Sequence, residues 1–371
     1  METFPDHPEV HLLIPFLQLT PGEDSSAVST AIERVVDRGW FVLGPELEAF
    51  EAEFAEATSS SCAVGVGTGT DAIAIGLRCL GVGPGDEVIT SPLSAAYSAL
   101  AIMMVGARPV FADIEAERLT IDAAAVAAAI TPRTVAILPV HIYGQPADMP
   151  ALARVAERHN LAIVEDCCQA HLATCGGRPV GSFGAAAAYS FYPTKNLGAL
   201  GDGGALTMND PGLAARAKRL RNGGQVNRYE HLEFGVNSRL DEMQAAILRA
   251  RLTFLPAWTE RRRDLARRYR AELAETTGAV VPREFDEGHV YHLFPILSEE
   301  REQVRARLKA CGVETLVHYP FPIPRQPALA AERPAECPTA DRVCAEVFSL
   351  PLYPSMPDGA IPRVAAALQQ P

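Results

Sequence analysis

Hydrophobic positions along most of the chain alternate between the spacing of strands and the spacing of helices. Short runs rich in apolar and β-branched residues, typical of buried strands, lie at residues 62–67, 87–90, 109–114, 134–140, 161–166, 187–192 and 204–208. Apolar residues three and four positions apart, typical of helices, fill most of the intervals, at residues 70–80, 122–130 and 149–160. This alternation predicts a mainly parallel sheet with helices on both faces. Ligands of such sheets bind at the carboxyl ends of the strands.

Helical patterns also flank this alternating region. Residues 25–39 and 45–58 predict two amphipathic helices ahead of the first strand. From residue 239 to about 277 the chain is rich in Arg and Glu and predicts a long helix. We expect Pro256 to kink that helix, because proline cannot donate a helical hydrogen bond.

The spacing changes again towards the C-terminus. Residues 289–297 predict a strand, residues 299–311 a helix, and residues 319–338 form a proline-rich segment. We therefore expect a large domain over residues 1–250 and a smaller C-terminal α+β domain over residues 251–371.

Composition and charge narrow the range of partners. Hydrophobic residues make up 48% of the chain and charged residues 21%, which is typical of a globular protein with a sizeable core. The net charge of -12 argues against nucleic acid or an anionic membrane as a partner. The opening METFPDHPEV does not resemble a signal peptide, and no apolar run approaches the ~20 residues of a membrane span. The 8 cysteines show no CxxC pair and no Cys/His ligand spacing, so we expect a cytoplasmic protein with thiols and no metal.

Lysine usage singles out one residue. Arginine supplies nearly all of the 33 basic residues, and the lysines are Lys195, Lys218 and Lys309. Lys218 and Lys309 lie in arginine-bearing amphipathic stretches, where a surface charge explains them. Lys195 instead follows a predicted strand, in the glycine-rich loop YPTKNLGALGDGG. A lysine kept there indicates chemistry that arginine cannot do, because only an amine with an accessible pKa forms an imine.

Two further features would form a site together with this lysine. Residues 67–70, GTGT, join a predicted strand to a helix, whose free amides bind anions, although a tight turn capped by Thr68 or Thr70 explains them too. Asp166 ends another predicted strand, where many such residues only cap a loop. An anion-binding helix start, a strand-end carboxylate and Lys195 are together what pyridoxal phosphate requires. The carboxylate would keep the pyridine nitrogen protonated, and the lysine would hold the aldehyde and move the proton.

With these motifs in order along nearly the whole chain, the sequence resembles the DegT/DnrJ/EryC1/StrS family of sugar aminotransferases. The resemblance rests on FVLGPELEAFEAEFA, GTDAI, HIYGQPADM, EDCCQAH, SFYPTKNLGALGDGG, GVNSRLDEMQAAIL, HYP and FSLPLYPSM. It implies an α/β fold of the fold type I architecture of enzymes that use pyridoxal phosphate.

The resemblance also assigns roles to individual residues around the cofactor. It implies that Lys195 is the Schiff-base lysine, that Asp166 pairs with the pyridine nitrogen and that Gln169 contacts the cofactor hydroxyl. The residues that it implies for the cofactor phosphate are Gly69, Thr70 and Ser190, joined by Asn237 from a partner subunit. The last role implies a homodimer with shared active sites, whose interface should be large and apolar.

Other histidines and tyrosines have weaker assignments. His318 and Tyr319 match a family segment near the substrate, although a loop around Pro320 would explain that segment as well. His171 matches a family histidine after the glutamine, for which we expect a structural hydrogen bond. His292 is interpreted as a packed strand residue.

Three positions depart from the family pattern. Ala95 falls where an aromatic residue usually stacks on the cofactor ring, and Tyr97 is a possible substitute. Cys168 falls where a small residue packs against the other ring face. Ser238 replaces the common aromatic residue after Asn237.

The reaction implied by the resemblance is a ping-pong transamination. The amino donor would be L-glutamate, and the acceptor a keto-sugar, most simply a nucleotide-linked 3-keto-6-deoxyhexose, because KNLGALGDGG is similar to the loop of members that aminate C-3. A 4-keto nucleotide sugar and a keto-cyclitol stay open as acceptors. Sugar 3-dehydratases of this fold group replace the lysine with histidine, so Lys195 disfavours dehydration. A binding or regulatory protein without catalysis is the alternative from another class, and the presence of Lys195 and Asp166 disfavours it.

Overall fold

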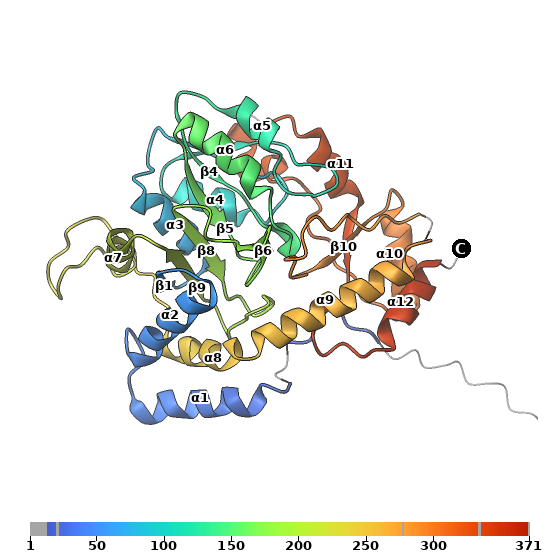
Figure 1. Ribbon diagram of the computed structural model, residues 1–371, viewed down its shortest axis with the longest axis horizontal. Coiled ribbons are helices and arrows are strands. Elements are labelled where there is room, and N and C mark those ends of the chain that lie inside the picture. The colour runs from blue at the N-terminus through green and yellow to red at the C-terminus, as the bar shows by residue number, and fades with distance from the viewer. Residues whose placement is uncertain (1–12, 20–21, 277, 333–334, 370–371) are drawn as a thin grey trace, which may run out of the picture.

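The part of the chain that the structure describes is built around a seven-stranded sheet (Figure 1). The structure is a computed structural model, and it describes residues 13–19, 22–276, 278–332 and 335–369. In sheet order the strands are β1 (Cys62–Val66), β9 (Gly204–Met208), β8 (Ala186–Ser190), β5 (Ala162–Asp166), β4 (Thr134–Leu138), β2 (Glu87–Thr90) and β3 (Arg108–Phe111). β9 runs antiparallel to both of its neighbours, and the other neighbouring pairs are parallel. The prediction of a mainly parallel sheet is confirmed.

Helices cover both faces of this sheet (Figure 1). The helices that share a core on one face are α3 (Gly69–Cys79), α4 (Tyr97–Met104) and α7 (Pro211–Leu220). The helices that share a core on the other face are α2 (Pro45–Ala57), α5 (Ala123–Ala129), α6 (Met149–His159) and α8 (Glu242–Leu252). Helix α1 (Ser25–Arg38) packs outside them, against α8. Both faces are therefore buried, which accounts for the nearly continuous apolar runs of the parallel strands.

A second core lies beside the large sheet, and the long helix α9 (Leu255–Glu272) leads into it (Figure 1). The other main elements of this region are β10 (Phe294–Leu297), α10 (Arg301–Ala310), α11 (Pro338–Glu346), β11 (Val347–Leu350) and α12 (Ala360–Gln369). Short elements complete the described chain, namely β6 (Thr174–Cys175), β7 (Arg178–Pro179), η1 (Ile142–Gly144), η2 (Ile323–Arg325) and η3 (Pro327–Glu332). Leu255 packs in the large core, whereas Leu265 and Tyr269 pack in the second one. Because one helix serves both cores, the domain boundary at residue 250 stays a prediction.

Local details differ from the sequence expectation at three places. The helix expected over residues 239–277 is two helices, and Pro256 lies in the first turn of α9 rather than at a kink. Proline is tolerated there because the first amides of a helix have no partner within it. The strand expected at residues 289–297 begins only at Phe294, after Tyr291 with φ of 45°. Helix α4 was not predicted as an element, because it is apolar on nearly every side and shows no periodic pattern.

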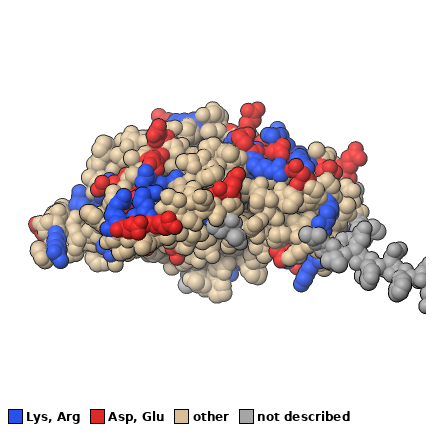
Figure 2. Space-filling model, turned by 90° about the horizontal axis from the view of Figure 1, so that it is seen from below, with Lys and Arg blue, Asp and Glu red and all other residues tan. Residues whose placement is uncertain are grey.

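Ion pairs tie the outer helices together. Glu46 on α2 is buried, and its carboxylate pairs with Arg34 and Arg38 of α1 and with Arg249 of α8. The hydrogen bond from Arg34 is the main reason that the pKa of Glu46 falls to about 2. Figure 2 shows the molecule from below the view of Figure 1. On that face acidic and basic side chains lie side by side rather than in separate patches of one sign. Within the described ranges, no helix has the length and apolar character that crossing a bilayer needs.

A buried carboxylate also fixes the start of α2. Glu242, the first residue of α8, is fully buried and accepts hydrogen bonds from the amides of Gly44, Glu46 and Leu47 at 2.8–2.9 Å. These amides lie at the N-cap and in the first turn of α2, where a helix has no internal acceptors. Glu242 therefore caps α2 from a position almost two hundred residues away along the chain.

We expect Glu242→Ala to lower the free energy of unfolding by about 3 kcal/mol, because several buried amides lose their acceptor at once. Urea denaturation followed by circular dichroism measures this change. Glu48→Ala is the matched control, since Glu48 is an exposed carboxylate in the same helical turn. A loss for Glu242→Ala no larger than that of the control contradicts the capping role.

Candidate active site

Three segments far apart in the sequence meet where β5, β8 and α3 come together. Asp166 is the last residue of β5, Ser190 is the last residue of β8, and Gly69 is the first residue of α3. A Cβ atom on Gly69 would lie 2.7 Å from the Ser190 Cβ and 2.8 Å from the Cys168 Sγ. Glycine at position 69 therefore lets these three segments of the chain approach so closely. The convergence expected from the parallel sheet is present.

The start of α3 offers unused hydrogen-bond donors. The Thr68 side chain accepts from the Asp71 amide at 3.0 Å, and its carbonyl accepts from the Ala72 amide at 3.0 Å. The amides of Gly69 and Thr70 find no acceptor in the part of the chain that the structure describes. Both explanations given for residues 67–70 thus apply, because Thr68 caps the helix and two amides remain for an anion.

The Asp166 carboxylate is buried, and each of its two oxygens accepts one hydrogen bond. The Ser98 hydroxyl donates to Oδ2 at 2.8 Å, and the Cys168 amide donates to Oδ1 at 3.1 Å. Ser98 lies near the start of α4, the helix that the sequence pattern did not predict. Each oxygen keeps a further acceptor site, so the carboxylate can still bind a protonated ligand nitrogen.

Lys195 lies in the loop after β8 and lines a cavity of about 270 Å³. Burial lowers the pKa of its amine, which the nearby Cys168 and Asp166 oppose. The positive charge of Lys195 in turn lowers the pKa values of His171, His292 and His318, after burial as the main cause. The amine forms no hydrogen bond or ion pair with the described residues, which leaves it available for a ligand.

Gln169 links the surroundings of Asp166 and Lys195 to the HYP segment, residues 318–320. Its Oε1 accepts from the Tyr143 amide at 2.6 Å, and its Nε2 donates to the Tyr319 hydroxyl at 3.1 Å. The Tyr143 hydroxyl donates to the His318 carbonyl at 2.5 Å. The His318 ring lies 3.1 Å from the Ser349 Oγ, and its pKa falls to about 4. His318 and Tyr319 are therefore linked to Gln169 by hydrogen bonds, directly or through Tyr143, and their contact with substrate stays a prediction.

The residues present fit pyridoxal phosphate. The cofactor needs an anion seat, a carboxylate for its ring nitrogen and an amine for its aldehyde. The free amides of α3, the Asp166 carboxylate and the unpaired Lys195 amine supply these groups. The tight approach at Gly69 brings the first two next to Ser190 and Cys168.

Comparison with known proteins agrees with this chemistry. Residues 23–369 match the model of the DegT/DnrJ/EryC1/StrS aminotransferase family. The chain belongs to this family. A transaminase of Streptomyces venezuelae, dTDP-3-amino-3,4,6-trideoxy-alpha-D-glucose transaminase, is 47% identical over 96% of each chain. Erythromycin biosynthesis sensory transduction protein EryC1 of Saccharopolyspora erythraea is 46% identical over 96% of this chain and 99% of its own.

A solved structure of a family member is closely similar as well. The crystal structure of S. venezuelae DesV in complex with a ketimine intermediate has a TM-score of 0.94 and 47% sequence identity. The similarity covers 96% of this chain and 98% of that one. The family and the fold type I architecture expected from the motifs are thus confirmed, and the protein is an aminotransferase.

The residues that depart from the family pattern lie in different surroundings in the structure. Ser238 accepts from the Gly67 amide at 2.9 Å and donates to Asp71 at 2.7 Å, so it clamps the turn before α3. Cys168 packs against Gly69, and burial raises the pKa of its thiol. The Tyr97 side chain is 63% exposed at the start of α4 and lies near Tyr319. Which of Ala95, Tyr97 and Cys168 faces a cofactor ring stays a prediction.

Asn237 and two histidines have distinct surroundings. Asn237 is exposed, and its side chain forms no hydrogen bond with the described residues, so its role across a subunit interface stays a prediction. His292 is buried with its Nδ1 3.1 Å from the Asn196 Oδ1, which agrees with a packed histidine. The structural hydrogen bond expected for His171 stays a prediction. Both ring nitrogens are buried and have no hydrogen-bond partner of good geometry among the described residues, while the Ser190 backbone lies within reach of the ring. The ring also lies against Tyr189.

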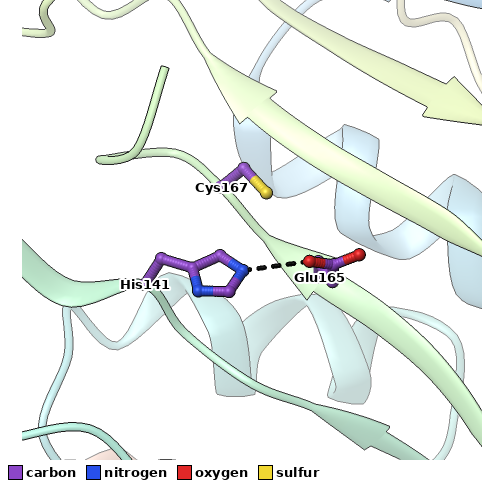
Figure 3. A group of neighbouring side chains, drawn as sticks. All are labelled: His141, Glu165 and Cys167. Atoms are coloured by element: carbon purple, nitrogen blue, oxygen red, sulfur yellow. Dashed lines mark hydrogen bonds and ion pairs between the residues drawn. The ribbon is translucent and has the colours of Figure 1, made fainter. Parts of the chain in front are cut away.

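A separate buried group resembles a metal site but is structural. His141, Glu165 and Cys167 lie side by side, with the His141 Nε2 3.2 Å from Glu165 (Figure 3). The His141 Nδ1 accepts from the Ala147 amide at 3.1 Å, which places the ring proton on Nε2. The Glu165 oxygens accept from the backbone amides of Gly181, Phe183 and Gly184, each at 2.8 Å. The histidine lone pair and the carboxylate are already used, so the group ties β5 to the turn before β8.

We therefore expect that EDTA treatment followed by zinc addition changes neither the melting temperature nor the transaminase rate. Inductively coupled plasma mass spectrometry on the purified protein measures the bound metal directly. In contrast, Glu165→Gln should lower the free energy of unfolding by about 3 kcal/mol, because it weakens a charged acceptor of several buried amides. One equivalent of zinc retained by the wild type and lost in Glu165→Gln would contradict the structural role.

Proposed function

We propose that this pyridoxal phosphate-dependent aminotransferase moves the amino group of L-glutamate to a nucleotide-linked 3-keto-6-deoxyhexose. The observation that carries the proposal is that the Lys195 amine, the Asp166 carboxylate and the start of α3 all lie around Cys168. Asp166 and Cys168 both act on the pKa of Lys195, the Cys168 amide donates to Asp166, and the Cys168 Sγ packs against Gly69. Amino donor and keto acceptor use the same site in turn, in a ping-pong sequence. We also propose a cytoplasmic location, which free, buried thiols such as those of Cys79, Cys167 and Cys344 support.

We propose a role for each residue that would hold the cofactor. When bound, pyridoxal phosphate supplies an electron sink for the negative charge that develops on the substrate carbon. The amides of Gly69 and Thr70, with the Ser190 hydroxyl, bind its phosphate. Asp166, oriented by Ser98, keeps the ring nitrogen protonated. Gln169 donates to the ring hydroxyl.

Lys195 has two proposed tasks. Its amine holds the cofactor aldehyde between reactions. Once it is released from the aldehyde, the Lys195 amine takes the proton from the Cα of the amino donor and delivers it to the C4′ carbon of the cofactor. Burial lowers the pKa of this amine, which is the direction that a proton-accepting amine requires.

The sugar acceptor is supported by the relatives and by one loop. The S. venezuelae relative is named for a dTDP-sugar that carries its amine at C-3. The loop KNLGALGDGG around Lys195 favours the same position. A 4-keto sugar and a keto-cyclitol would meet the same cofactor site, so only the acceptor assay separates them. The name of the S. erythraea relative suggests regulation, but the intact Lys195 and Asp166 favour catalysis.

We expect the purified enzyme to react with L-glutamate in a first half-reaction and release 2-oxoglutarate. After this half-reaction the enzyme carries the amino group and is isolated in that form. It should then aminate a 3-keto dTDP-sugar faster than a 4-keto dTDP-sugar. NMR of the product identifies the sugar carbon that bears the nitrogen. Lys195→Arg is the matched variant, since it keeps a cation but cannot form an imine, and we expect its rate to fall by at least about 1000-fold. An enzyme that takes up the cofactor and reacts with no amino acid sinks the proposal.

A homodimer with shared sites is also proposed. Large apolar side chains stand exposed near the start of α8, including Trp40 at 55% and Phe41 at 52%. The Phe41 carbonyl bonds to the Glu242 amide, and the Leu200 amide bonds to Gln244, so these exposed residues are neighbours. The surface thus joins the loop of Lys195, where a second copy would bury it.

A mixing experiment tests whether Asn237 acts across that interface. Lys195→Ala and Asn237→Asp would each abolish activity as homodimers. If Asn237 reaches the site of the partner, a mixed dimer has one intact site, and a randomised equal mixture recovers about a quarter of wild-type activity. Refolding the two variants together and assaying the mixture gives the readout. No recovery, although mass spectrometry shows mixed dimers, places Asn237 in its own site instead.

A further inference from the structure

One buried cation in the cavity beside Lys195 has no counter-charge. Arg262 projects from the middle of α9 and is 4% exposed. Its Nη1 donates to the carbonyls of Leu352, Tyr291 and His292 at 2.9, 3.2 and 3.3 Å. Its Nε is buried with no partner, and its Nη2 meets no acceptor among the residues that the structure describes. One edge of the guanidinium is therefore satisfied and the other is not.

The missing counter-charge is the unusual feature. No carboxylate in the described ranges lies within 4.0 Å of Arg262, and burial alone lowers its pKa, to about 10. The side chain is still protonated at neutral pH. A buried charge without a partner is costly, so such groups are normally paired. Hydrogen bonds to carbonyls on one edge offset only part of that cost.

The other charged groups of the same cavity are already engaged. Arg251 pairs with Asp24 at 2.8 Å and also donates to the Gly198 carbonyl at 2.5 Å. The Glu23 carboxylate accepts from the indole of Trp258 at 2.6 Å. Lys195 and Arg262 are the cations that remain without a carboxylate among the described lining residues. Both lie near His292, because its carbonyl accepts from Arg262 at 3.3 Å and its Nδ1 lies 3.1 Å from the Oδ1 of Asn196, the residue after Lys195.

The geometry suits a ligand with an anion at one end and an amine at the other. The same cavity is also lined by Leu17, Trp258 and Tyr353, which offer apolar surface to the rest of such a ligand. The Nε and Nη2 edge of an arginine presents two parallel N–H groups, which match the two oxygens of a carboxylate. We propose that Arg262 binds a carboxylate of the amino donor and so orients the donor towards Lys195. This inference rests on the proposed transaminase function and adds the residue that recognises its first substrate.

The proposal predicts an effect on one half-reaction and not on the other. Arg262→Met should weaken binding of glutarate, an unreactive dicarboxylate, by on the order of 10- to 100-fold, as loss of a charged hydrogen-bonded pair implies. Isothermal titration of the holoenzyme with glutarate measures this change. The L-glutamate half-reaction should lose a similar factor in kcat/KM. Amination of the keto-sugar, started from enzyme already carrying the amine, should keep its rate.

Two variants separate recognition from structure. Arg261→Met is the matched control, because Arg261 also lies on α9 and donates to carbonyls of the C-terminal segment, at Pro354 and Met356, but pairs with Asp264 and Asp358. It should leave glutarate binding unchanged. Arg262→Lys keeps the charge and loses the two-pronged edge, and it serves if Arg262→Met does not fold. It should bind glutarate more weakly than the wild type.

Three outcomes overturn the assignment. Unchanged glutarate binding in both Arg262 variants removes the carboxylate role. An equal loss in both half-reactions makes Arg262 a structural residue, and a loss confined to the sugar half-reaction makes its anion the diphosphate of the nucleotide. If the wild type reacts with no amino acid, the proposed function itself fails, while the glutarate titration still decides whether Arg262 binds a carboxylate.

Discussion

The close approach of three chain segments at the start of α3 is the constraint on which the site depends. No side chain fits at Gly69, because a Cβ there would meet Ser190 and Cys168. Gly204 is under the same constraint, since a Cβ there would collide with the carbonyl of Thr68. Strand β9 lies between β1 and β8 in the sheet, so the turn after β1 must pass directly over the start of β9. Glycine at both positions lets the amides of α3 reach the ends of β5 and β8, and every other group of the site is placed relative to that contact.

Two adjacent carboxylates on β5 show how the same strand serves both stability and chemistry. Side chains alternate between the faces of a strand, so Glu165 and Asp166 point to opposite sides of the sheet. Glu165 is consumed by His141 and by the backbone amides before β8, and it has no capacity left for a ligand. Asp166 receives one donor on each oxygen, from Ser98 and Cys168, and keeps acceptor capacity towards the site. The turn that Glu165 fixes leads into β8, and thus the structural carboxylate positions the strand that ends at Ser190 and continues into the loop of Lys195.

The sequence allowed prediction where a local signal and a topological rule coincide. The sheet, most helices and the convergence of Asp166 and Lys195 followed from apolar spacing and from the rule that parallel strands end on one edge. Ser98 escaped prediction because α4 has no polar face to reveal its period. Arg262 escaped as well, since it lies in an arginine-rich helix that looks like a solvated surface. The role of each residue follows from contacts with distant segments of the chain. The spacing of residues along the sequence does not predict such contacts.

Buried charge is the property that separates structural residues from functional ones in this fold. Glu46, Glu242 and Arg251 are buried, and each finds ion-pair or hydrogen-bond partners within the described chain. Those partners offset the loss of hydration, so removing one side of such a pair costs stability. Lys195 and Arg262 line one cavity without a carboxylate partner. Under the proposed function, ligands would engage both side chains: the cofactor aldehyde would take up the Lys195 amine, and a carboxylate of the amino donor would pair with Arg262.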